Sequence, residues 1–256
     1  MNKYLQITKF TIKKEAKFIL NYLSSIFGFT IHIIVFYFIW DYILGSKQLN
    51  GYTTNMLIWY VIVGEYILYS SNKFNRQISS DVKNGTIANM LTKPINFVLY
   101  LFFENASNII KIIVNLIAAI LLGLIMAGPI SLSITNVIFF IISILFSILL
   151  NIMFELIIGL STFFIEETKA LYLVLSKLML IIVFSPVEMF PEWGQIILKF
   201  LPTTYAIYAP AKILVMFDIS QAIKLILCQL LSIIICCGIL FLQYKKGVKK
   251  INVNGG

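Results

Sequence analysis

Acidic, basic and histidine side chains stand inside long apolar runs of this chain, where a charge is costly. Glu65, Glu155 and His32 each fall within such a run, as do Lys111 and Lys177. A charge at the centre of a hydrocarbon layer costs at least about 2.5–3.5 kcal/mol, so residues of this kind often line a substrate path or relay protons. We therefore predict that Glu65, Glu155 and His32 line a translocation path or an interface between subunits.

Each of these residues also has a purely structural interpretation. Glu155 and Lys177 could form an ion pair inside a helix bundle, or the lysines could extend along the helix surface toward the headgroups. His32 could be a packing residue that is held by a hydrogen bond. The residue types alone leave both interpretations open.

Motifs that bind nucleotides or catalyse hydrolysis are absent from the sequence. No glycine is followed by lysine, so there is no phosphate-binding loop of the GxxxxGKS or GxxxxGKT type. His32 is the only histidine, and neither HExxH nor GxSxG occurs. The cysteines share one apolar run without the spacing of metal ligands: Cys228, Cys236 and Cys237. We expect no catalytic residue, metal site or cofactor in the chain itself, and no enzymatic activity of its own.

A hydrophilic segment at residues 73–100 has the features of a docking element. It contains a helix-like stretch, Phe74–Lys83, that ends before an asparagine and Gly85, a good helix stop. A second short helical stretch, Thr86–Thr92, follows, and Pro94 breaks the chain before the next apolar run. Because the segment is amphipathic and structured, we predict that it binds a cytosolic protein.

The elements that carry these residues must be membrane helices. Of the 256 residues, 60% are hydrophobic and only 12% are charged, and the mean hydropathy is +0.94. Soluble domains have about 45–50% apolar and about 25% charged residues, so a soluble fold could not bury this much apolar surface. We predict an all-α membrane protein with a single transmembrane domain over residues 1–256. Six runs approach the length that crosses a bilayer: 24–44, 55–71, 101–127, 136–164, 170–187 and 221–244.

The distribution of basic residues predicts the orientation in the membrane. Fourteen of the 20 lysines and arginines lie before the first run, between the second and third, between the fourth and fifth, or after the sixth. Cytoplasmic loops carry such an excess, so we expect both termini in the cytoplasm. The net charge of +9 comes from these loops, which meet anionic lipid headgroups, and does not indicate nucleic-acid binding.

Two further segments are expected at the membrane surfaces. Residues 1–22 combine lysines with apolar residues at helical spacing, which suits an interfacial amphipathic helix or a simple positively charged anchor. Residues 185–218, on the outer side, are too apolar for an aqueous loop, and four prolines argue against a straight span. We predict two short re-entrant helices there, with a seventh span as the alternative.

This arrangement resembles the ABC-2 type permeases, in particular the bacterial branch that includes daunorubicin-resistance-like membrane subunits. The resemblance rests on the stretch DVKNGTIANMLTKP from Asp81 to Pro94, which is similar to the family's glycine, leucine and basic-proline pattern. It rests also on PEW at 191–193, FLP at 200–202 and the segment from Tyr205 to Pro210. In layout it covers the whole chain.

The resemblance implies a type V exporter-like fold and a set of partners. Two copies of a cytosolic ABC ATPase would bind the ATP, and a second permease, identical or homologous, would complete the path for a hydrophobic or amphipathic cargo such as a drug, peptide or lipid. The ATPase contacts are expected at Asp81, Lys83, Gly85 and Thr86, with a smaller contact at Glu166, Glu167 and Lys169. A charged, solvated loop is the alternative for each of these residues.

Two other functions are compatible with the sequence. A proton-coupled secondary transporter could use Glu65 or Glu155, would need no ATPase, and would often contain an internal repeat; no convincing repeat is visible. A membrane protein without transport activity, such as an immunity or sensor component, would need no translocation path.

Overall fold

The computed structural model describes residues 2–16, 19–70, 74–87, 97–105, 109–165 and 167–254. These residues form helices joined by short connections, and the described part contains no β-strand, which confirms the predicted all-α class. The α-helices are α1 (Asn2–Ala16), α2 (Ile19–Leu44), α3 (Thr54–Ser70), α4 (Asn75–Lys83), α6 (Phe97–Asn105), α7 (Ile109–Met126), α8 (Ile134–Leu160), α9 (Lys169–Phe184), α10 (Glu192–Phe200), α11 (Pro202–Val215) and α12 (Ile219–Asn254). Two 3₁₀ turns are η2 (Ser161–Phe163) and η3 (Val187–Met189).

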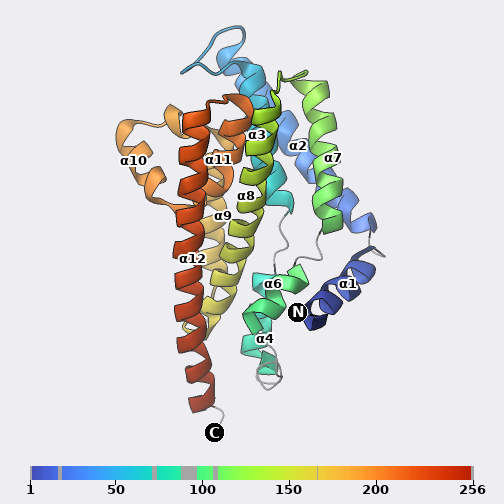
Figure 1. The fold of residues 1–256 in the computed structure, drawn as a ribbon, viewed down its shortest axis with the longest axis vertical. Coiled ribbons are helices and arrows are strands. Elements are labelled where there is room, and N and C mark those ends of the chain that lie inside the picture. Colours follow the sequence, from blue (N-terminus) through green and yellow to red (C-terminus); the bar gives the residue numbers. More distant parts are fainter. Residues whose placement is uncertain are drawn as a thin grey trace.

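Long helices run side by side along the molecule (Figure 1). The helices α1 and α4 and the C-terminal end of α12 lie toward one end, and the connection between α2 and α3 lies toward the other. This arrangement puts the two helices at the chain ends on the side of α4, in keeping with the predicted even number of crossings. Their orientation with respect to the cell stays a prediction.

Four of the described helices are long and apolar enough to cross a membrane by length and composition: Ser24–Leu44, Ile109–Met126, Ile134–Phe163 and Ile219–Gly247. They confirm the membrane class. The second and fifth predicted runs correspond to α3 and α9, which have 17 and 16 residues. Most of α3 is buried by other helices, so its apolar side chains meet protein. The total of six crossings therefore stays a prediction.

The third predicted run, 101–127, is wrong at its start. Its first residues belong to the separate helix α6, and the long apolar helix α7 begins only at Ile109. Helix α6 packs against α1, and the Thr8 hydroxyl donates a hydrogen bond to the Phe103 carbonyl at 2.9 Å. Hydropathy could not separate the two helices, because a short apolar helix packed on a neighbour reads like the start of a span.

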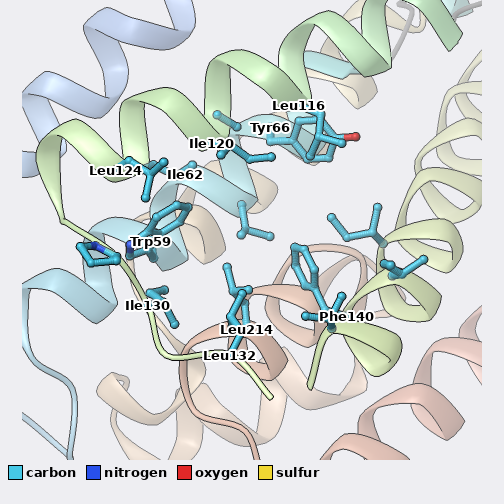
Figure 2. A pocket seen from close by; sticks show the side chains of 16 residues that line it. Trp59, Ile62, Tyr66, Leu116, Ile120, Leu124, Ile130, Leu132, Phe140 and Leu214 are labelled. Atoms are coloured by element: carbon cyan, nitrogen blue, oxygen red, sulfur yellow. The ribbon is translucent and has the colours of Figure 1, made fainter. Parts of the chain in front are cut away.

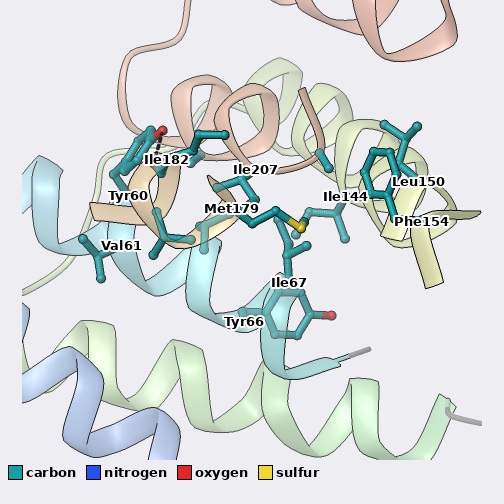
Figure 3. Packing of buried hydrophobic residues seen from close by; sticks show 14 of the residues in the cluster. Tyr60, Val61, Tyr66, Ile67, Ile144, Leu150, Phe154, Met179, Ile182 and Ile207 are labelled. Atoms are coloured by element: carbon teal, nitrogen blue, oxygen red, sulfur yellow. Dashed lines mark hydrogen bonds between the residues drawn. The ribbon is translucent and has the colours of Figure 1, made fainter. Parts of the chain in front are cut away.

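Helix α11 lies inside the bundle and contacts α3, α8, α9 and α12. The buried alanines Ala206, Ala209 and Ala211 let it approach these neighbours closely, as small residues do between membrane helices. Figure 3 shows side chains of α3, α8, α9 and α11 meeting in one cluster, and the Tyr60 hydroxyl donates to the Ile182 carbonyl at 3.0 Å.

The predicted pair of short helices in residues 185–218 is present as α10 and α11. Prolines separate them as the sequence suggested, since Pro191 precedes α10 and Pro202 begins α11. Proline is favoured at the first turn of a helix because the amide hydrogen that it lacks would have no partner there. Whether this pair enters the membrane from one side and returns stays a prediction.

A buried polar cluster joins α12 to α8 and α11. The Ser143 hydroxyl donates to Gln229 Oε1 at 2.9 Å, and Gln229 Nε2 donates to Ser147 Oγ at 3.0 Å and to the Tyr205 carbonyl at 3.1 Å. Gln229, Ser143 and Ser147 have no exposed surface. Hydrogen bonds of this kind hold membrane helices in register, because no water competes for them.

Candidate docking surface and buried polar groups

The N-terminus of α4 is held against α8 by a buried carboxylate. Glu155 Oε2 accepts a hydrogen bond from Asn75 Nδ2 at 2.5 Å and from the Asn75 backbone amide at 3.3 Å. Phe74, at the cap position of α4, makes no capping hydrogen bond through its side chain. Glu155 therefore takes over the role of a cap from another helix, where the free amide hydrogens and the helix dipole favour a negative charge.

The middle of α4 packs on the α8 backbone. Ile78 is buried, and a Cβ atom added to Gly159 would lie only 2.8 Å from Ile78 Cδ1. Only glycine leaves room for this contact, so the Ile78 side chain packs directly on the α8 backbone at Gly159. Together, Asn75 and Ile78 hold α4 to the end of α8 at two successive turns.

Helix α4 also contacts the start of α9. The Thr168 hydroxyl donates to Ser79 Oγ at 3.3 Å, and the Arg76 guanidinium lies 5.9 Å from the centre of the Tyr172 ring. Helix α4 thus contacts both α8 and the start of α9, so a displacement of α4 acts on both.

Two predicted contact groups come together on the exposed side of α4. Lys83 Nζ lies 3.8 Å from Glu167 Oε2, and both side chains are exposed. Such an exposed pair contributes at most about 1 kcal/mol to the stability of the fold. Its value here is that it shows the two predicted contact groups to be neighbours. Lys169 begins α9 and is exposed as well. Glu166, which was predicted with them, lies outside the described residues, as do Thr92, Lys93 and Pro94.

Helix α4 ends in a glycine turn, as its sequence predicted. Gly85 has a φ of +73°, a left-handed conformation in which other residues are strained. The Thr86 hydroxyl then donates back to Asp81, at 3.1 Å from the carboxylate Oδ1. We call the exposed residues Lys83, Asn84, Gly85, Thr86, Glu167 and Lys169 the α4 surface. Its turn conformation is held internally, and its charged groups remain open to a partner.

His32 and Glu65 lie together between α2 and α3. The His32 Nδ1 is 3.2 and 3.3 Å from the two carboxylate oxygens of Glu65, and the His32 ring makes an edge contact with Tyr69. Glu65 is fully buried, whereas the His32 side chain is 45% exposed. The pair is therefore reached from the side of His32. Lys177, on α9, is another exposed basic residue of a predicted span.

The Glu155 carboxylate makes its described hydrogen bonds at a different place in the bundle from the His32–Glu65 pair. The described hydrogen bonds of the Glu155 carboxylate are to Asn75, so Glu155 belongs to the junction of α4 and α8. The contact of His32 with Glu65 is a hydrogen bond of the kind that the packing interpretation requires. A direct role for Glu65, Glu155 or His32 in a translocation path stays a prediction.

A second charged cluster, which the sequence analysis did not identify, lies at the other end of the bundle. Lys212 of α11 is buried, and its Nζ lies 2.8 Å from Glu188 Oε1. The Tyr208 hydroxyl donates to the same oxygen at 2.6 Å, and Lys212 donates to the Tyr52 hydroxyl at 2.9 Å. The signal that could have found it is a lysine in the otherwise apolar run after Pro210, since a buried lysine needs an anionic partner.

The Glu188 cluster ties the connection between α2 and α3 to η3 and α11. The Asn50 side chain donates to the Glu188 carbonyl at 2.9 Å. The Lys212 ammonium lies over the Tyr52 ring, with Nζ 4.7 Å from the centre of that ring. Burial alone would raise the pKa of the Glu188 carboxyl, but hydrogen bonds from Lys212 and Tyr208 outweigh it and hold that pKa below its usual value. Glu188 is therefore ionised at neutral pH and pairs with Lys212.

The family comparison covers nearly all of these features. The model of the ABC-2 family transporter protein matches residues 29–255. The chain belongs to the ABC-2 family. The match includes the α4 surface, the His32–Glu65 pair and the Glu188 cluster, and it leaves α1 outside. No match to a curated protein was found.

Family membership establishes the general kind of protein. This ABC-2 protein is a multi-pass membrane permease of a family whose members carry no ATPase of their own and work with a cytosolic ABC ATPase. The resemblance drawn from the stretches at 81–94 and 191–210 is thereby confirmed.

Proposed function

We propose that this permease is the membrane half of an ABC exporter that moves a hydrophobic or amphipathic cargo, such as a drug, peptide or lipid, out of a bacterial cell. Two ATPase subunits would bind and hydrolyse the ATP, and a second permease, identical or homologous, would complete the path. The chain lies in the cytoplasmic membrane with both termini in the cytoplasm, as its basic loops indicate. The permease itself uses no cofactor.

One observation carries this proposal. Helix α4 is fixed to α8 by Asn75 and Ile78 and to the start of α9 by Ser79, while the α4 surface stays exposed. A loop that served only as a connection would need no such anchorage. A rigid helix with an exposed, charged end suits an element that receives force from a soluble partner.

The contacts of α4 suggest how nucleotide binding would reach the membrane helices. When the two ATPases close on ATP, they favour one arrangement of the permeases over another, which is a shift between existing states. Movement of α4 acts on α8 through Glu155 and Gly159, and α8 in turn contacts α11 and α12. In this role Glu155 transmits motion and does not touch cargo.

His32 and Glu65 are the groups that we assign to the path or to the interface with the second permease. Glu65 is fully buried within this chain, but His32 presents almost half of its side chain outward from a membrane helix. A titratable group exposed at that depth is costly against lipid. A neighbouring permease or a water-filled path lowers this cost, and the exposed Lys177 of α9 needs such an environment as well.

Co-purification tests the partner and the α4 surface together. The tagged permease is purified from its own membrane in mild detergent, and the associated proteins are identified by mass spectrometry. We expect an ABC ATPase, with recovery lost when Lys83 and Thr86 are both changed to glutamate. The control is Lys199→Glu, which alters an exposed lysine on α10 far along the chain. Isolation of the permease alone, under conditions that keep ABC complexes intact, would refute the proposal.

The His32–Glu65 pair favours one alternative function. A histidine and a carboxylate in contact can exchange a proton near neutral pH, so a proton-coupled secondary transporter remains the second candidate. It would transport in vesicles that contain the permease, a proton gradient and no ATPase. Transport that instead requires ATP and the co-purified subunit supports the exporter.

A further inference from the structure

An apolar cavity lies between α3, α7, α8 and α11, with a volume of about 380 Å³. None of its lining residues belongs to the α4 surface, the His32–Glu65 pair or the Glu188 cluster. Figure 2 shows Trp59 of α3 and Leu124 of α7 along one side, and Phe140 of α8 and Leu214 of α11 on the other. Residues 129–132, between α7 and α8, close one end with Ile130 and Leu132.

The cavity has a buried floor and a mouth toward the membrane. Trp59 and Ala119 in the wall are buried, whereas Leu124 of α7 and Ile141 of α8 are about half exposed, at 48% and 51%. Both of these helices are long and apolar enough to span a membrane. The opening between them therefore faces the hydrocarbon of the bilayer, in the half that adjoins residues 129–132.

The lining disfavours a polar ligand, because Trp59 and Tyr66 are the only lining residues with a polar side-chain atom. The indole nitrogen of Trp59 already donates to the Gly128 carbonyl at 2.9 Å, so it has no second hydrogen to offer. A charged or hydrogen-bonding group placed here would lose its hydration without compensation. An apolar cavity of about 150 Å³ is known to bind benzene, and the cavity described here is more than twice that volume.

We propose that this cavity binds one acyl chain of a membrane lipid, which enters between α7 and α8. Lipid chains are the apolar molecules present at the mouth. The exposed apolar surface continues from the mouth along both helices, through Ile117 on α7 and Ile138 on α8, so the cavity is an extension of the lipid-facing surface. The acyl chain fills the space that remains between α3, α7, α8 and α11. This assignment does not depend on the proposed exporter function.

Tryptophan fluorescence tests the proposal, because Trp59 lies in the cavity wall. The chain has three tryptophans, and changing Trp40 and Trp193 to phenylalanine leaves Trp59 as the reporter. The full chain is reconstituted in vesicles of phosphatidylcholine with brominated acyl chains and in matched vesicles without bromine. Bromine quenches an indole only at close range. We expect strong quenching of Trp59, although its side chain is buried by protein.

Trp40 provides the matched reference. It is also buried and lies near the same ends of the helices, but it stacks on Phe184 and does not line the cavity. A protein that keeps only Trp40 should show weak quenching. Equal quenching of Trp40 and Trp59 would mean that surrounding lipid reaches both, and it would overturn the proposal.

Filling the cavity gives the decisive comparison. Ala119→Phe on α7 projects a ring into the cavity, and Val137→Phe does the same from α8. Either change should reduce the quenching of Trp59 to the level of Trp40, and two variants guard against a failure of one to fold. Ile125→Phe adds the same ring to an exposed position of α7 that does not line the cavity and should leave the quenching unchanged.

Two results would contradict the proposal that the cavity binds an acyl chain. Unaltered quenching in the correctly folded Ala119→Phe and Val137→Phe proteins would show that the quencher acts from outside the cavity. Weak quenching of Trp59 in the parent, together with a cysteine crosslink between two copies at Ile141, would show that a second permease covers the mouth.

Discussion

At the scale of single residues, the polar side chains that water cannot reach decide most of the chemistry of this permease. Glu155, Lys212 and Gln229 are each nearly or fully buried, and each has hydrogen-bond partners on another element of the fold. Because no water replaces a lost partner in such places, each of these bonds restricts how its helices can pack. The residue-scale predictions concern the two ends of the bundle.

The ionisation of Glu188 is predicted to make the free energy of unfolding depend on pH. Its pKa is lowered from the usual 4.5 in the folded protein, so its carboxylate stabilises the fold in full above that value. The stabilisation is lost as the pH falls through the lowered pKa. Glu188→Gln should lower the free energy of unfolding by about 2 kcal/mol at neutral pH, since Lys212 loses its anion. Thermal unfolding in detergent measures the difference in stability between the parent and Glu188→Gln.

The matched control for Glu188 is Glu192→Gln, which removes an exposed carboxylate four residues away. It should leave the unfolding temperature unchanged. The difference between the parent and Glu188→Gln should also shrink as the pH is lowered below about 4. A constant difference across that range would mean that the ion pair with Lys212 does not stabilise the fold.

Gly159 is predicted to be required for the seating of α4. In Gly159→Ala the new Cβ would lie within 2.8 Å of Ile78 Cδ1, so α4 must shift at a cost of about 1–3 kcal/mol. A disulfide between Ser79→Cys and Thr168→Cys, in a protein without its native cysteines, reports the position of α4. Its yield should fall in Gly159→Ala and recover when Ile78→Ala is added.

Gly238→Ala is the control for that experiment, because nothing lies within 4 Å of the added carbon. This change should leave the disulfide yield as it is in the parent. If Gly159→Ala also left the yield unchanged, α4 would not be seated by the contact with Ile78.

At the scale of elements, short helices control the position of the long ones. Helix α4 packs on α8 and is hydrogen-bonded to the residue that precedes α9, and α11 lies within the bundle in contact with α3, α8, α9, α10 and α12. Helix α12 is tied to both α8 and α11 by Gln229. The short elements therefore link the spans to the surface that we assign to the ATPase.

Gln229→Leu is predicted to loosen α12 from α8. The substitution removes hydrogen bonds to Ser143, Ser147 and the Tyr205 carbonyl. Interhelical hydrogen bonds in membranes contribute about 0.6 kcal/mol each, so we expect a loss of about 1–2 kcal/mol in thermal unfolding. Gln221→Leu changes an exposed glutamine at the start of the same helix and should have little effect. Equal losses in both variants would contradict a specific role for Gln229.

At the scale of the whole molecule, a single copy of the chain exposes titratable side chains on membrane helices. In a monomer, lipid would surround these side chains. His32 on α2 and Lys177 on α9 are two such groups. The proposed assembly of two permeases gives both residues a polar environment. This placement does not decide whether the second permease is a copy of this chain or a relative.

His32→Cys is predicted to crosslink to a second permease. In membranes of a variant without Cys228, Cys236 and Cys237, a short bifunctional thiol reagent should produce a product of dimer size. Its mass identifies the partner when that partner also carries a cysteine at the interface. Ile138→Cys on the lipid-facing side of α8 should not react in this way. If both cysteines gave only monomers, the His32–Glu65 pair would not lie at a permease interface.

The membrane class, the helical content and the family could be predicted from the sequence. Apolar run length and the scarcity of charge suffice for the first two, because a bilayer imposes its thickness on any helix that crosses it. Local turn chemistry also predicted the end of α4 at Gly85 and the division of residues 185–218 by prolines. These features depend on neighbouring residues only, so no knowledge of the tertiary structure was needed.

Only the tertiary structure decided which distant residues meet. It brought Lys83 to Glu167, His32 to Glu65 and Lys212 to Glu188, and it placed the Glu155 carboxylate on α4. It also divided the apolar run at 101–127 between α6 and α7. Hydropathy along the chain cannot tell whether an apolar side chain meets lipid or another helix, since both are equally apolar. That choice is made by the packing of helices, and with it the location of every buried charge.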